Sequence, residues 1–415
     1  MEIMEDVVIV GAGIAGVATA VALKKVGIRA LVLEKSEGLR TTGTALSLFP
    51  NAWIALDALG VSHKLTSLYP ALLRGCVTNV ATGAVQDIKF GENSGPRAIH
   101  RKTLLNTLAE ELPPHSIRFS TKITSIELQE HGRISIPVLH LEDGTTIKSK
   151  VLIGCDGVHS MVAKWLGLSE TIHSGRYAVR GLSVYPEGHG FKQEVHQFVD
   201  VGKRAGFVPL NDKELYWFLL IPPQGNEMPR DPEIIQKEII EKYAKNFPSL
   251  YLDVVRRADL SELTWAPLML RNPLNVIFGN TCKGNVTVAG DAMHPMTPDI
   301  AQGGCSALED AVVLGRHIGN SFIKNGVVVP EEMEGAIYGY VKERRWRVGG
   351  LITGSFLSGW VQQGGSNWLM KFLRDFIFYG FIFSKLSKVV VYDCGKLPTV
   401  SGDDGQMHSS NHKTD

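Results

Sequence analysis

The sequence predicts an α/β protein in which a helix-covered parallel sheet is interrupted by an antiparallel sheet and followed by helices. The first observation is residues 6–35, "DVVIVGAGIAGVATAVALKKVGIRALVLEK", where strand, glycine loop, helix and second strand form a βαβ unit. The same order of strand, loop and helix returns in residues 284–316, "GNVTVAGDAMHPMTPDIAQGGCSALEDAVVLGR". Between them, residues 177–273 alternate apolar and polar side chains and are rich in aromatics, which is typical of antiparallel strands.

The length and charge of the chain favour a multidomain protein with a small-molecule ligand. Its 415 residues exceed what one compact core usually holds, so two domains are expected. The net charge of +1, from 43 Lys and Arg against 42 Asp and Glu, offers no electrostatic footprint for nucleic acid or an anionic membrane. We therefore expect a small molecule as the partner.

The cysteines and the first residues indicate a cytoplasmic protein. Five cysteines form an odd, widely spaced set without the pairing of a zinc site or a disulfide framework: Cys76, Cys155, Cys282, Cys305 and Cys394. The first strand begins by Val7, which leaves no room for a signal or transit segment. The most apolar run, "FIFYGFIF" at residues 376–383, is far shorter than the ~20 residues of a membrane-spanning helix. We expect a buried helix there, with weak peripheral membrane contact as the alternative.

The first glycine loop has the spacing of a dinucleotide-binding turn. In "GAGIAG", Gly11 allows the tight turn, Gly13 lets the backbone approach a pyrophosphate, and Gly16 lets the helix pack closely on the strand. The amino end of the following helix offers N–H groups and a positive dipole to phosphates. Glu34 ends the second strand, where its carboxylate can accept both ribose hydroxyls and disfavours the 2′-phosphate of NADP. The first domain is therefore predicted to be Rossmann-like.

The second glycine loop distinguishes FAD from NAD as the ligand. An NAD domain needs nothing from residues this far along the chain, whereas FAD has a ribityl chain and a ring system beyond its pyrophosphate. Gly290 and Asp291 follow the strand "NVTVA", and Asp291 can accept a ribityl hydroxyl. Gly303 and Gly304 let the backbone approach a flat ring, and the helix that begins there points its positive end at the ring atoms that gain negative charge on reduction. Both loops are therefore expected to hold one FAD.

Three motifs follow one another in the chain: "GAGIAG" with Glu34, "GCDGVHSMVAKWLG" at residues 154–167, and "GDAMHPMTPDIAQGGCSALEDA" at residues 290–311. Together they resemble the single-component, FAD-dependent aromatic hydroxylases, the family of para-hydroxybenzoate and salicylate hydroxylases. The resemblance is closest to plant monooxygenases similar to the catalytic domain of zeaxanthin epoxidase. It links Asp156 and Gly157 to the FAD pyrophosphate and to NAD(P)H, and it links Arg40 and Arg101 to the flavin.

The resemblance also assigns roles within residues 290–304. Pro298 is expected to pack beside the edge of the flavin ring. Ala301 stands where the family usually has glycine, so that one methyl group against the ring could restrict flavin movement. The complete set of expected cofactor-binding residues is Gly11, Gly13, Ile14, Ala15, Gly16, Glu34, Lys35, Arg40, Arg101, Asp156, Gly157, Gly290, Asp291, Pro298, Ala301, Gln302, Gly303 and Gly304.

The expected domain boundaries lie where the hydrophobic pattern changes. A discontinuous FAD-binding domain is predicted for residues 1–75, 97–175 and 275–320. An inserted antiparallel-sheet substrate domain is predicted for residues 76–96 and 176–274, with one helix near residues 232–246. C-terminal helices are expected over residues 321–400 and a disordered tail over residues 401–415.

By the same resemblance, NAD(P)H reduces the FAD, O2 is the co-substrate, and a flavin C4a-hydroperoxide hydroxylates or epoxidises an aromatic or electron-rich small molecule. The cofactor carries the chemistry, while the protein excludes water and orients the substrate. No metal site is expected. Two alternatives stay open: a flavin-dependent reductase or dehydrogenase that inserts no oxygen, and a catalytically silent flavin-binding sensor whose only sequence support is Ala301.

Several other side chains have two interpretations. Arg180 and Tyr216 lie in predicted strands of the substrate domain and, where they face the ring, would bind a carboxylate and a phenolic oxygen of a mostly hydrophobic substrate. His294 is expected to stabilise its loop by a hydrogen bond rather than act as a base, and His196 is a weaker candidate.

The remaining features have structural explanations. Cys155 and Cys305 are expected to be small buried apolar residues rather than redox groups. The basic run "KERRWR" at residues 342–347 is expected to be the solvated face of a helix. Asn285 begins a glycosylation sequon, but it lies in a predicted buried strand and is discounted.

Overall fold

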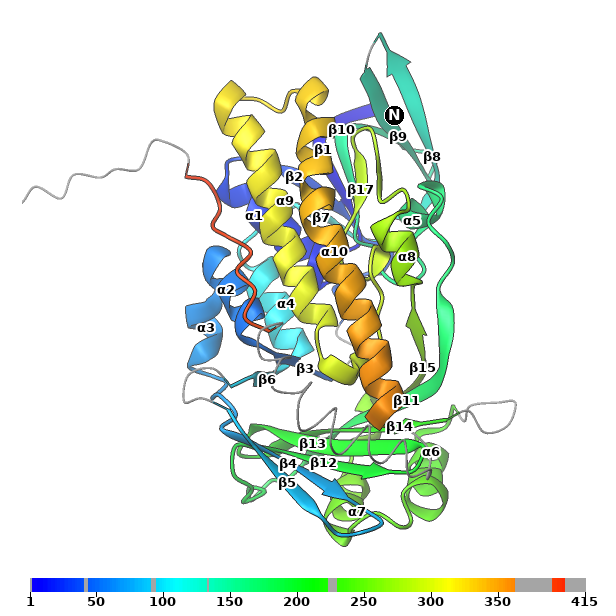
Figure 1. Ribbon diagram of the computed structural model, residues 1–415. Coiled ribbons are helices and arrows are strands. Elements are labelled where there is room, and N and C mark those ends of the chain that lie inside the picture. Colours follow the sequence, from blue (N-terminus) through cyan, green and yellow to red (C-terminus); the bar gives the residue numbers. More distant parts are fainter. Residues whose placement is uncertain are drawn as a thin grey trace, which may run out of the picture.

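The computed structural model describes residues 2–40, 44–90, 95–132, 134–222, 230–362 and 390–399. These residues form a largely parallel sheet and an antiparallel sheet, and two long helices, α9 (Gly303–Asn325) and α10 (Pro330–Gln362), lie side by side on the first (Figure 1). The architecture is the predicted α/β class with an antiparallel sheet inserted and helices following.

The first sheet has eight strands, in the order β16-β17-β10-β1-β2-β7 with β9 paired to β10 and β8 to β9. Their bounds are β1 (Glu2–Val10), β2 (Ala30–Leu33), β7 (Ile117–Arg118), β8 (Ile123–His131), β9 (Ile134–Leu141), β10 (Thr146–Gly154), β16 (Cys282–Lys283) and β17 (Val286–Val288). Val10 lies opposite Gly154 in the parallel pair of β1 and β10, and Gly154 lies opposite Val288 in the parallel pair of β10 and β17. The carboxyl ends of three strands from distant parts of the chain therefore meet at one edge.

Helices pack on this sheet and share its core. Val7, Val8 and Ile9 of β1 are completely buried, as expected for a strand covered on both faces. The first helix, α1, has every residue from Ile14 to Leu23 buried, which explains why its Ala- and Val-rich sequence shows no polar face. Helix α1 spans Ile14–Lys25. The shorter helices that follow are α2 (Pro50–Ala58), α3 (Ser62–Thr66), α4 (Arg101–Ala109), α5 (Met161–Trp165) and α8 (Pro273–Ile277). A small sheet pairs β3 (Ala45–Leu48) with β6 (Arg97–His100).

The second sheet has seven strands in the order β15-β11-β14-β13-β12-β4-β5. Their bounds are β4 (Arg74–Asn79), β5 (Val85–Lys89), β11 (Ile172–Val184), β12 (Glu194–Asp200), β13 (Lys203–Asn211), β14 (Glu214–Ile221) and β15 (Thr264–Leu270). All neighbours are antiparallel except β12 and β4. One face buries Trp217 and Phe207 against α6 (Pro232–Glu238) and against Tyr251 of α7 (Ser249–Arg256).

The helical parts of this second region differ from the prediction. The single helix expected near residues 232–246 is α6 followed by a π-helical turn, η1 (Ile239–Tyr243), and a second helix, α7, comes after Pro248. Further along the chain, residues 390–399 form no helix and lie against α2 and α9, where Asn51 N donates to Val390 O. The apolar run at residues 376–383 and the predicted tail at residues 401–415 lie outside the described residues.

Candidate active site

Three loops that are far apart in the sequence meet at the carboxyl ends of β1, β10 and β17. Cys155 N donates to Val10 O over 2.7 Å, and Ala289 N donates to Gly154 O over 2.9 Å, so the strand ends are hydrogen-bonded to one another. Gly290 touches α1 directly, since a β-carbon at Gly290 would lie 2.7 Å from the β-carbon of Ala15. The two glycine loops therefore face a common space.

The first loop has the backbone that its glycines predict. Gly11 has φ +99°, and a β-carbon there would lie 2.6 Å from Cys155 O. A β-carbon on Gly16 would clash with Gly11 O, so this glycine lets α1 pack on the turn. Helix α1 begins at Ile14 after Gly13, with no side chain capping its amino end. Its first N–H groups are available to an anion such as a phosphate.

Glu34 is ionised and fixes the turn around it. Burial by itself raises the pKa of this carboxyl, but hydrogen bonds from Ala12 N (2.8 Å) and Ser36 N (2.9 Å) outweigh burial and lower the pKa. The next residue, Lys35, is exposed. A carboxylate at the end of the second strand is suited to accept hydrogen bonds from ribose hydroxyls. Two hydrogen bonds of the Glu34 carboxylate are already made to the loop itself.

The second motif places Asp156 at the amino end of α5. Its carboxylate accepts from Met161 N at 2.7 Å and from Oγ of the N-cap residue Ser160 at 2.5 Å, so it helps to cap this helix, and burial raises its pKa. Gly157 follows with φ +82°. The capping contacts are a structural role that the sequence did not reveal.

Arg40, Arg101 and Asp291 form a charged group beside the three loops. Arg101 Nη1 donates to Arg40 O over 2.7 Å. Burial lowers the pKa of Arg101, the charge of Arg40 lowers it further, and Asp291 raises it. The surrounding protein raises the pKa of Asp291, while His294, Arg101 and Arg180 partly offset that rise, although solvent reaches the Asp291 side chain. Asp291 therefore lies within electrostatic range of Arg101 of the first domain and of Arg180 of the second sheet.

Residues 290–304, called the 290–304 loop from here on, reach α9 through a turn that glycine normally supplies. Ala301 is left-handed, with φ +51°, after the 3-10 turn η4 (Pro298–Ile300). Pro298 opens that turn and is half-buried. Gln302 is buried, and α9 begins at Gly303 and Gly304 without a side-chain cap. The loop therefore presents backbone N–H groups, as α1 does.

His294 stabilises the loop, as predicted, through a buried carboxylate on α9. His294 Nε2 lies 2.6 Å from Asp310 Oδ2, which also accepts from Gly290 N over 2.9 Å. Arg344 of α10 donates from Nε to Asp310 Oδ1 over 2.7 Å and from Nη1 to Glu309 over 2.6 Å. Burial alone would lower the pKa of Arg344, but the two carboxylates raise it, so the cluster is ionised.

The basic run at residues 342–347 is therefore not the solvated face that the sequence suggested. Arg344 is completely buried, and Arg347 binds Glu309 through two hydrogen bonds of 2.7 and 2.5 Å. Tyr392, from the described residues 390–399, covers both guanidinium groups, with its ring 4.0 Å from Arg347 Cζ. Only Lys342 and Trp346 of this run are exposed.

The second sheet turns Arg180 and Tyr216 toward the first domain. Tyr216 packs in a cluster with Leu182 and Val208 that also contains Ala98 of β6, whereas Val179 and Trp217 face the opposite core. The charge of Arg180 acts on both Tyr216 and Asp291. His196 lies on the opposite face, stacked on Phe207 with ring centroids 4.8 Å apart, and is not part of this site.

An ion pair that the sequence did not reveal ties the 290–304 loop to the second sheet. Asp299 accepts from both terminal nitrogens of Arg176, at 2.8 and 2.7 Å, and its backbone oxygen accepts from Arg204 at 3.2 Å. All three residues are buried. The loop is thus held by Asp310 of α9 and by Arg176 of the second sheet.

The polar groups of the site fit a flat cofactor that carries phosphates. His294 Nδ1 and Gln302 Nε2 are buried, and within the described part of the chain neither has a hydrogen-bond partner. Two helices direct uncapped amino ends toward the space between the loops. A phosphate-bearing ligand with hydrogen-bonding ring edges suits this donor set.

Comparison with known proteins identifies that ligand and the family. Residues 4–324 match the family model described as an FAD binding domain. The chain is 41% identical to Monooxygenase 2 of Arabidopsis thaliana over 94% of its own length and 98% of the relative's. The chain belongs to the FAD-dependent monooxygenases. This monooxygenase is also 29% identical to an FAD-dependent urate hydroxylase of Mycolicibacterium vanbaalenii, over 74% of this chain and 78% of that one.

The fold of the monooxygenase is shared by a solved structure, Klebsiella pneumoniae HpxO complexed with FAD and uric acid. The TM-score is 0.80, the sequence identity is 23%, and the match covers 95% of this chain and 98% of the other. The protein is an oxidoreductase that binds FAD, and the residues around the three loops fit that cofactor.

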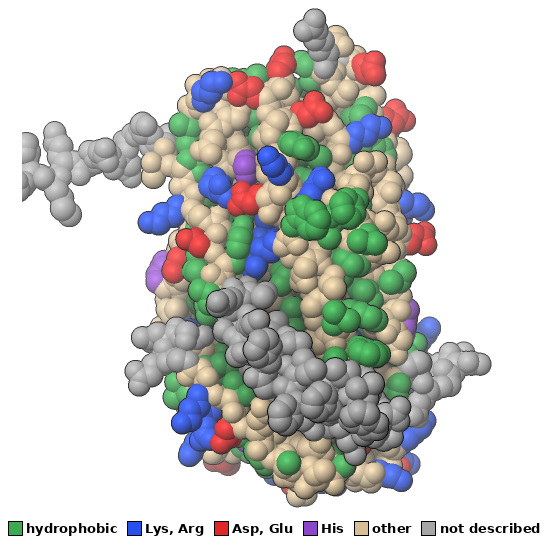
Figure 2. All heavy atoms as spheres, in the orientation of Figure 1, with side chains coloured by type: hydrophobic (Ala, Val, Ile, Leu, Met, Phe, Trp, Pro, Cys, Tyr) green, Lys and Arg blue, Asp and Glu red, His purple; other side chains and the backbone are tan. Residues whose placement is uncertain are grey.

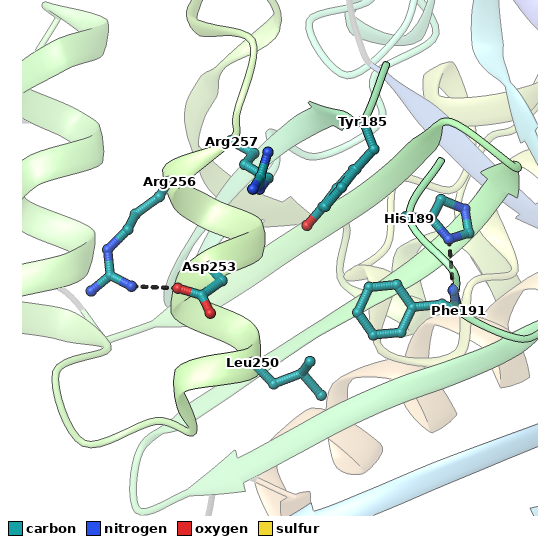
Figure 3. Close-up of a pocket in the computed structure, with 7 residues that line it drawn as sticks. All are labelled: Tyr185, His189, Phe191, Leu250, Asp253, Arg256 and Arg257. Atoms are coloured by element: carbon teal, nitrogen blue, oxygen red, sulfur yellow. Dashed lines mark hydrogen bonds and ion pairs between the residues drawn. The ribbon is translucent and has the colours of Figure 1, made fainter. Parts of the chain in front are cut away.

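A surface hollow of about 540 Å³ lies elsewhere on the monooxygenase (Figure 3). It is lined by Tyr185, His189, Phe191, Leu250, Asp253, Arg256 and Arg257. Asp253 already pairs with Arg256 at 2.6 Å, and Arg257 lies over the Tyr185 ring at 5.0 Å. Tyr185 and Phe191 pack on the core beneath α7, on the face of the sheet opposite Arg180. The hollow is therefore separate from the FAD site.

Two smaller predictions concern buried side chains. Cys155 and Cys305 are buried, and burial raises the pKa of both thiols, that of Cys305 to about 12, so they are protonated at neutral pH. Asn285 of the sequon is buried, and its side-chain amide donates to Pro330 O over 2.9 Å. A glycan has no room at this side chain.

Proposed function

We propose that this monooxygenase consumes NAD(P)H and O2 to hydroxylate or epoxidise an aromatic or electron-rich, mostly hydrophobic small molecule. One oxygen atom enters the substrate, the other leaves as water, and NAD(P)H supplies the two electrons. A cytoplasmic location is part of the proposal and rests on the scattered, unpaired cysteines of the sequence.

The observation that carries the proposal is the side of the second sheet on which Arg180 and Tyr216 lie. They lie on the face of the second sheet that packs toward the first domain, and Arg180 acts electrostatically on Asp291 of the loop. The side chains around them, such as Leu182 and Val208, are apolar and buried. A substrate held there is shielded from water beside the cofactor.

Bound flavin supplies the redox chemistry: it takes electrons from NAD(P)H and activates O2. The chain's own residues bind and orient. The amino ends of α1 and α9 would hold the negative charge of the cofactor, and Asp291 would accept a hydrogen bond from a hydroxyl of its ribityl chain. Burial raises the pKa of Tyr216 while Arg180 lowers it in part, so the hydroxyl is protonated at neutral pH and donates a hydrogen bond to a substrate oxygen.

Labelled oxygen tests the reaction type. The FAD-loaded protein is given NADH or NADPH, a panel of phenols, aromatic carboxylates and lipophilic alkenes, and 18O2, and the products are analysed by mass spectrometry. We expect one 18O atom in the product and no turnover without O2. Equal turnover under anaerobic conditions would support the reductase or dehydrogenase alternative. Bound FAD with no turnover on any compound would support the sensor.

A further inference from the structure

Helices α8 and α10 expose an unusual number of large apolar side chains on one surface. The residues of this surface, called the α8–α10 face, are Leu274, Phe278, Tyr338, Trp346, Leu357 and Trp360, whose exposed fractions are 58, 70, 57, 62, 50 and 53%. Figure 2 shows hydrophobic side chains gathered over this part of the molecule. Contiguous apolar patches of this kind mark interaction sites.

The side chains form a continuous surface along α10. Trp346, Gly350, Thr353, Leu357 and Trp360 follow one another at helical spacing and are all exposed. From residue 348 to residue 362, α10 contains no charged side chain. Phe278, just after α8, meets the Trp346 ring edge-to-face with centroids 5.7 Å apart, so the two helices present one surface.

The charges around the α8–α10 face favour a lipid bilayer as its partner. The amino end of α10 is acidic, but the exposed charged residue closest to the uncharged part of the helix is Lys342. Lys283 and Arg345 line a hollow beside Tyr338 and Phe278, where they outnumber its one acidic side chain, Glu334. Trp, Tyr and Phe with nearby basic side chains are the residues that insert at the headgroup level of anionic membranes. The attraction is local, because the whole chain has a charge of only +1.

We propose that the α8–α10 face docks the protein on the surface of a bilayer that contains anionic lipids. The contact is peripheral, since no helix among the residues described here is long and apolar enough to cross a membrane. Docking lies beyond the oxygenation reaction and does not depend on it.

The buried side of the helix that carries the docked face contacts the FAD site. Ser355 Oγ of α10 lies 3.1 Å from Thr297 Oγ1 of the 290–304 loop, and Gly359 of α10 packs against the Arg176–Asp299 pair. Trp360 is the next residue. If the proposed function holds, a lipophilic substrate dissolved in the bilayer has a short path to the flavin.

Vesicle co-sedimentation of the FAD-loaded full chain tests docking without any turnover. The vesicles contain phosphatidylcholine alone or phosphatidylcholine mixed with phosphatidylserine. We expect binding to the mixed vesicles, and a loss of affinity of roughly tenfold or more for the triple variant Phe278→Ser, Trp346→Ser, Trp360→Ser. The matched control Leu68→Ser, Val85→Ser, Val201→Ser removes equally exposed apolar side chains from other surfaces and should bind like wild type.

A charge variant keeps the test decisive if the triple variant folds poorly, as judged by FAD absorbance and thermal unfolding. Lys342→Glu should weaken binding to the mixed vesicles by roughly fivefold or more and leave any binding to neutral vesicles unchanged. The proposal is overturned if wild type ignores both kinds of vesicle, or if the control triple loses as much affinity as the test triple. It is also overturned if light scattering reveals a dimer that the test triple dissociates, because a second copy then covers the face.

Discussion

His294 Nε2 lies 2.6 Å from Asp310 Oδ2, and both side chains are completely buried. The same carboxylate accepts from Gly290 N and from Arg344 Nε, so one side chain joins the turn that follows β17 to both long helices. The position of Gly290 and Asp291, and with it the fit of the FAD, therefore depends on Asp310.

Replacing that carboxylate should be costly. Asp310→Asn leaves Arg344 short of a counter-charge in a buried site, for which a loss of about 3–5 kcal/mol in unfolding free energy is typical. FAD affinity should fall as well, because the Gly290 turn loses its anchor. Urea unfolding and a flavin fluorescence titration measure the two effects. Asp143→Asn, which removes a carboxylate from an exposed pair with Arg118, is the control and should behave like wild type. Equal stability and FAD affinity in all three proteins would contradict the role of Asp310.

Acid should weaken the fold through the same group. Burial by itself raises the pKa of Asp310, but His294 and Arg344 and the hydrogen bonds lower it to about 2. A carboxyl whose folded pKa is depressed contributes stability above its unfolded pKa and loses that contribution as the pH falls toward its folded pKa. Roughly 2 kcal/mol should therefore disappear between pH about 4 and about 2.

The measurement is the unfolding free energy at several pH values for wild type and Asp310→Asn. The difference between the two proteins should shrink as the pH falls through that window. The raised pKa of Asp291 acts with the opposite sign, and its contribution is smaller in Asp310→Asn, because the charge of Asp310 is one cause of that rise. A difference that stays constant with pH would show that Asp310 does not titrate as inferred.

Ala301→Gly should not destabilise the protein. Ala301 has φ +51°, a conformation that costs an L-residue roughly 1–2 kcal/mol. Glycine avoids that cost, and the extra entropy that it gives the unfolded chain lowers the stability by a smaller amount. We expect a gain of about 0.5 kcal/mol by thermal unfolding. Ala289→Gly, at an extended φ of −143°, is the matched control and should lose stability, since this alanine is fully buried. Parallel losses in both variants would contradict strain at Ala301.

Arg180→Gln should change the choice of substrate. With the guanidinium removed, KM for a carboxylate-bearing substrate should rise roughly 10- to 100-fold, as expected for a lost hydrogen bond between charged groups. Neutral substrates should be affected much less, and kcat should change little. Steady-state kinetics on matched acids and amides test this, with Lys213→Gln in the exposed turn after β13 as control. A uniform fall in kcat on all substrates would point to a damaged FAD site instead.

Local signals explain why the fold and the cofactor loops could be predicted. Each glycine loop lies between its own strand and helix, so Gly11, Gly16 and Gly290 are recognisable within about 30 residues of sequence. The alternation of side chains along a strand also limits which face each residue occupies. Because Trp217 faces the core under α7, its neighbour Tyr216 must face the opposite side of the sheet.

Long-range ion pairs could not be predicted in this way. Asp299 pairs with Arg176, which is 123 residues away in the sequence, and Arg344 pairs with Asp310, which is 34 residues away. Nothing next to Arg344 in the sequence indicates a carboxylate partner, so a run of basic residues looked solvated. The capping contacts of Asp156 were not predicted, because the family resemblance had already assigned this residue to the FAD pyrophosphate and NAD(P)H.

The order of strands in the first sheet has a consequence for biosynthesis. Among the strands that the structure describes, β17 at Val286–Val288 is the last to leave the ribosome, and all seven strands of the antiparallel sheet precede it, ending at Leu270. A nascent chain can thus complete its antiparallel sheet while the 290–304 loop is still inside the ribosome. Capture of the vitamin-derived coenzyme is therefore a late event, and truncated translation products ending before Gly304 should leave the ribosome without it.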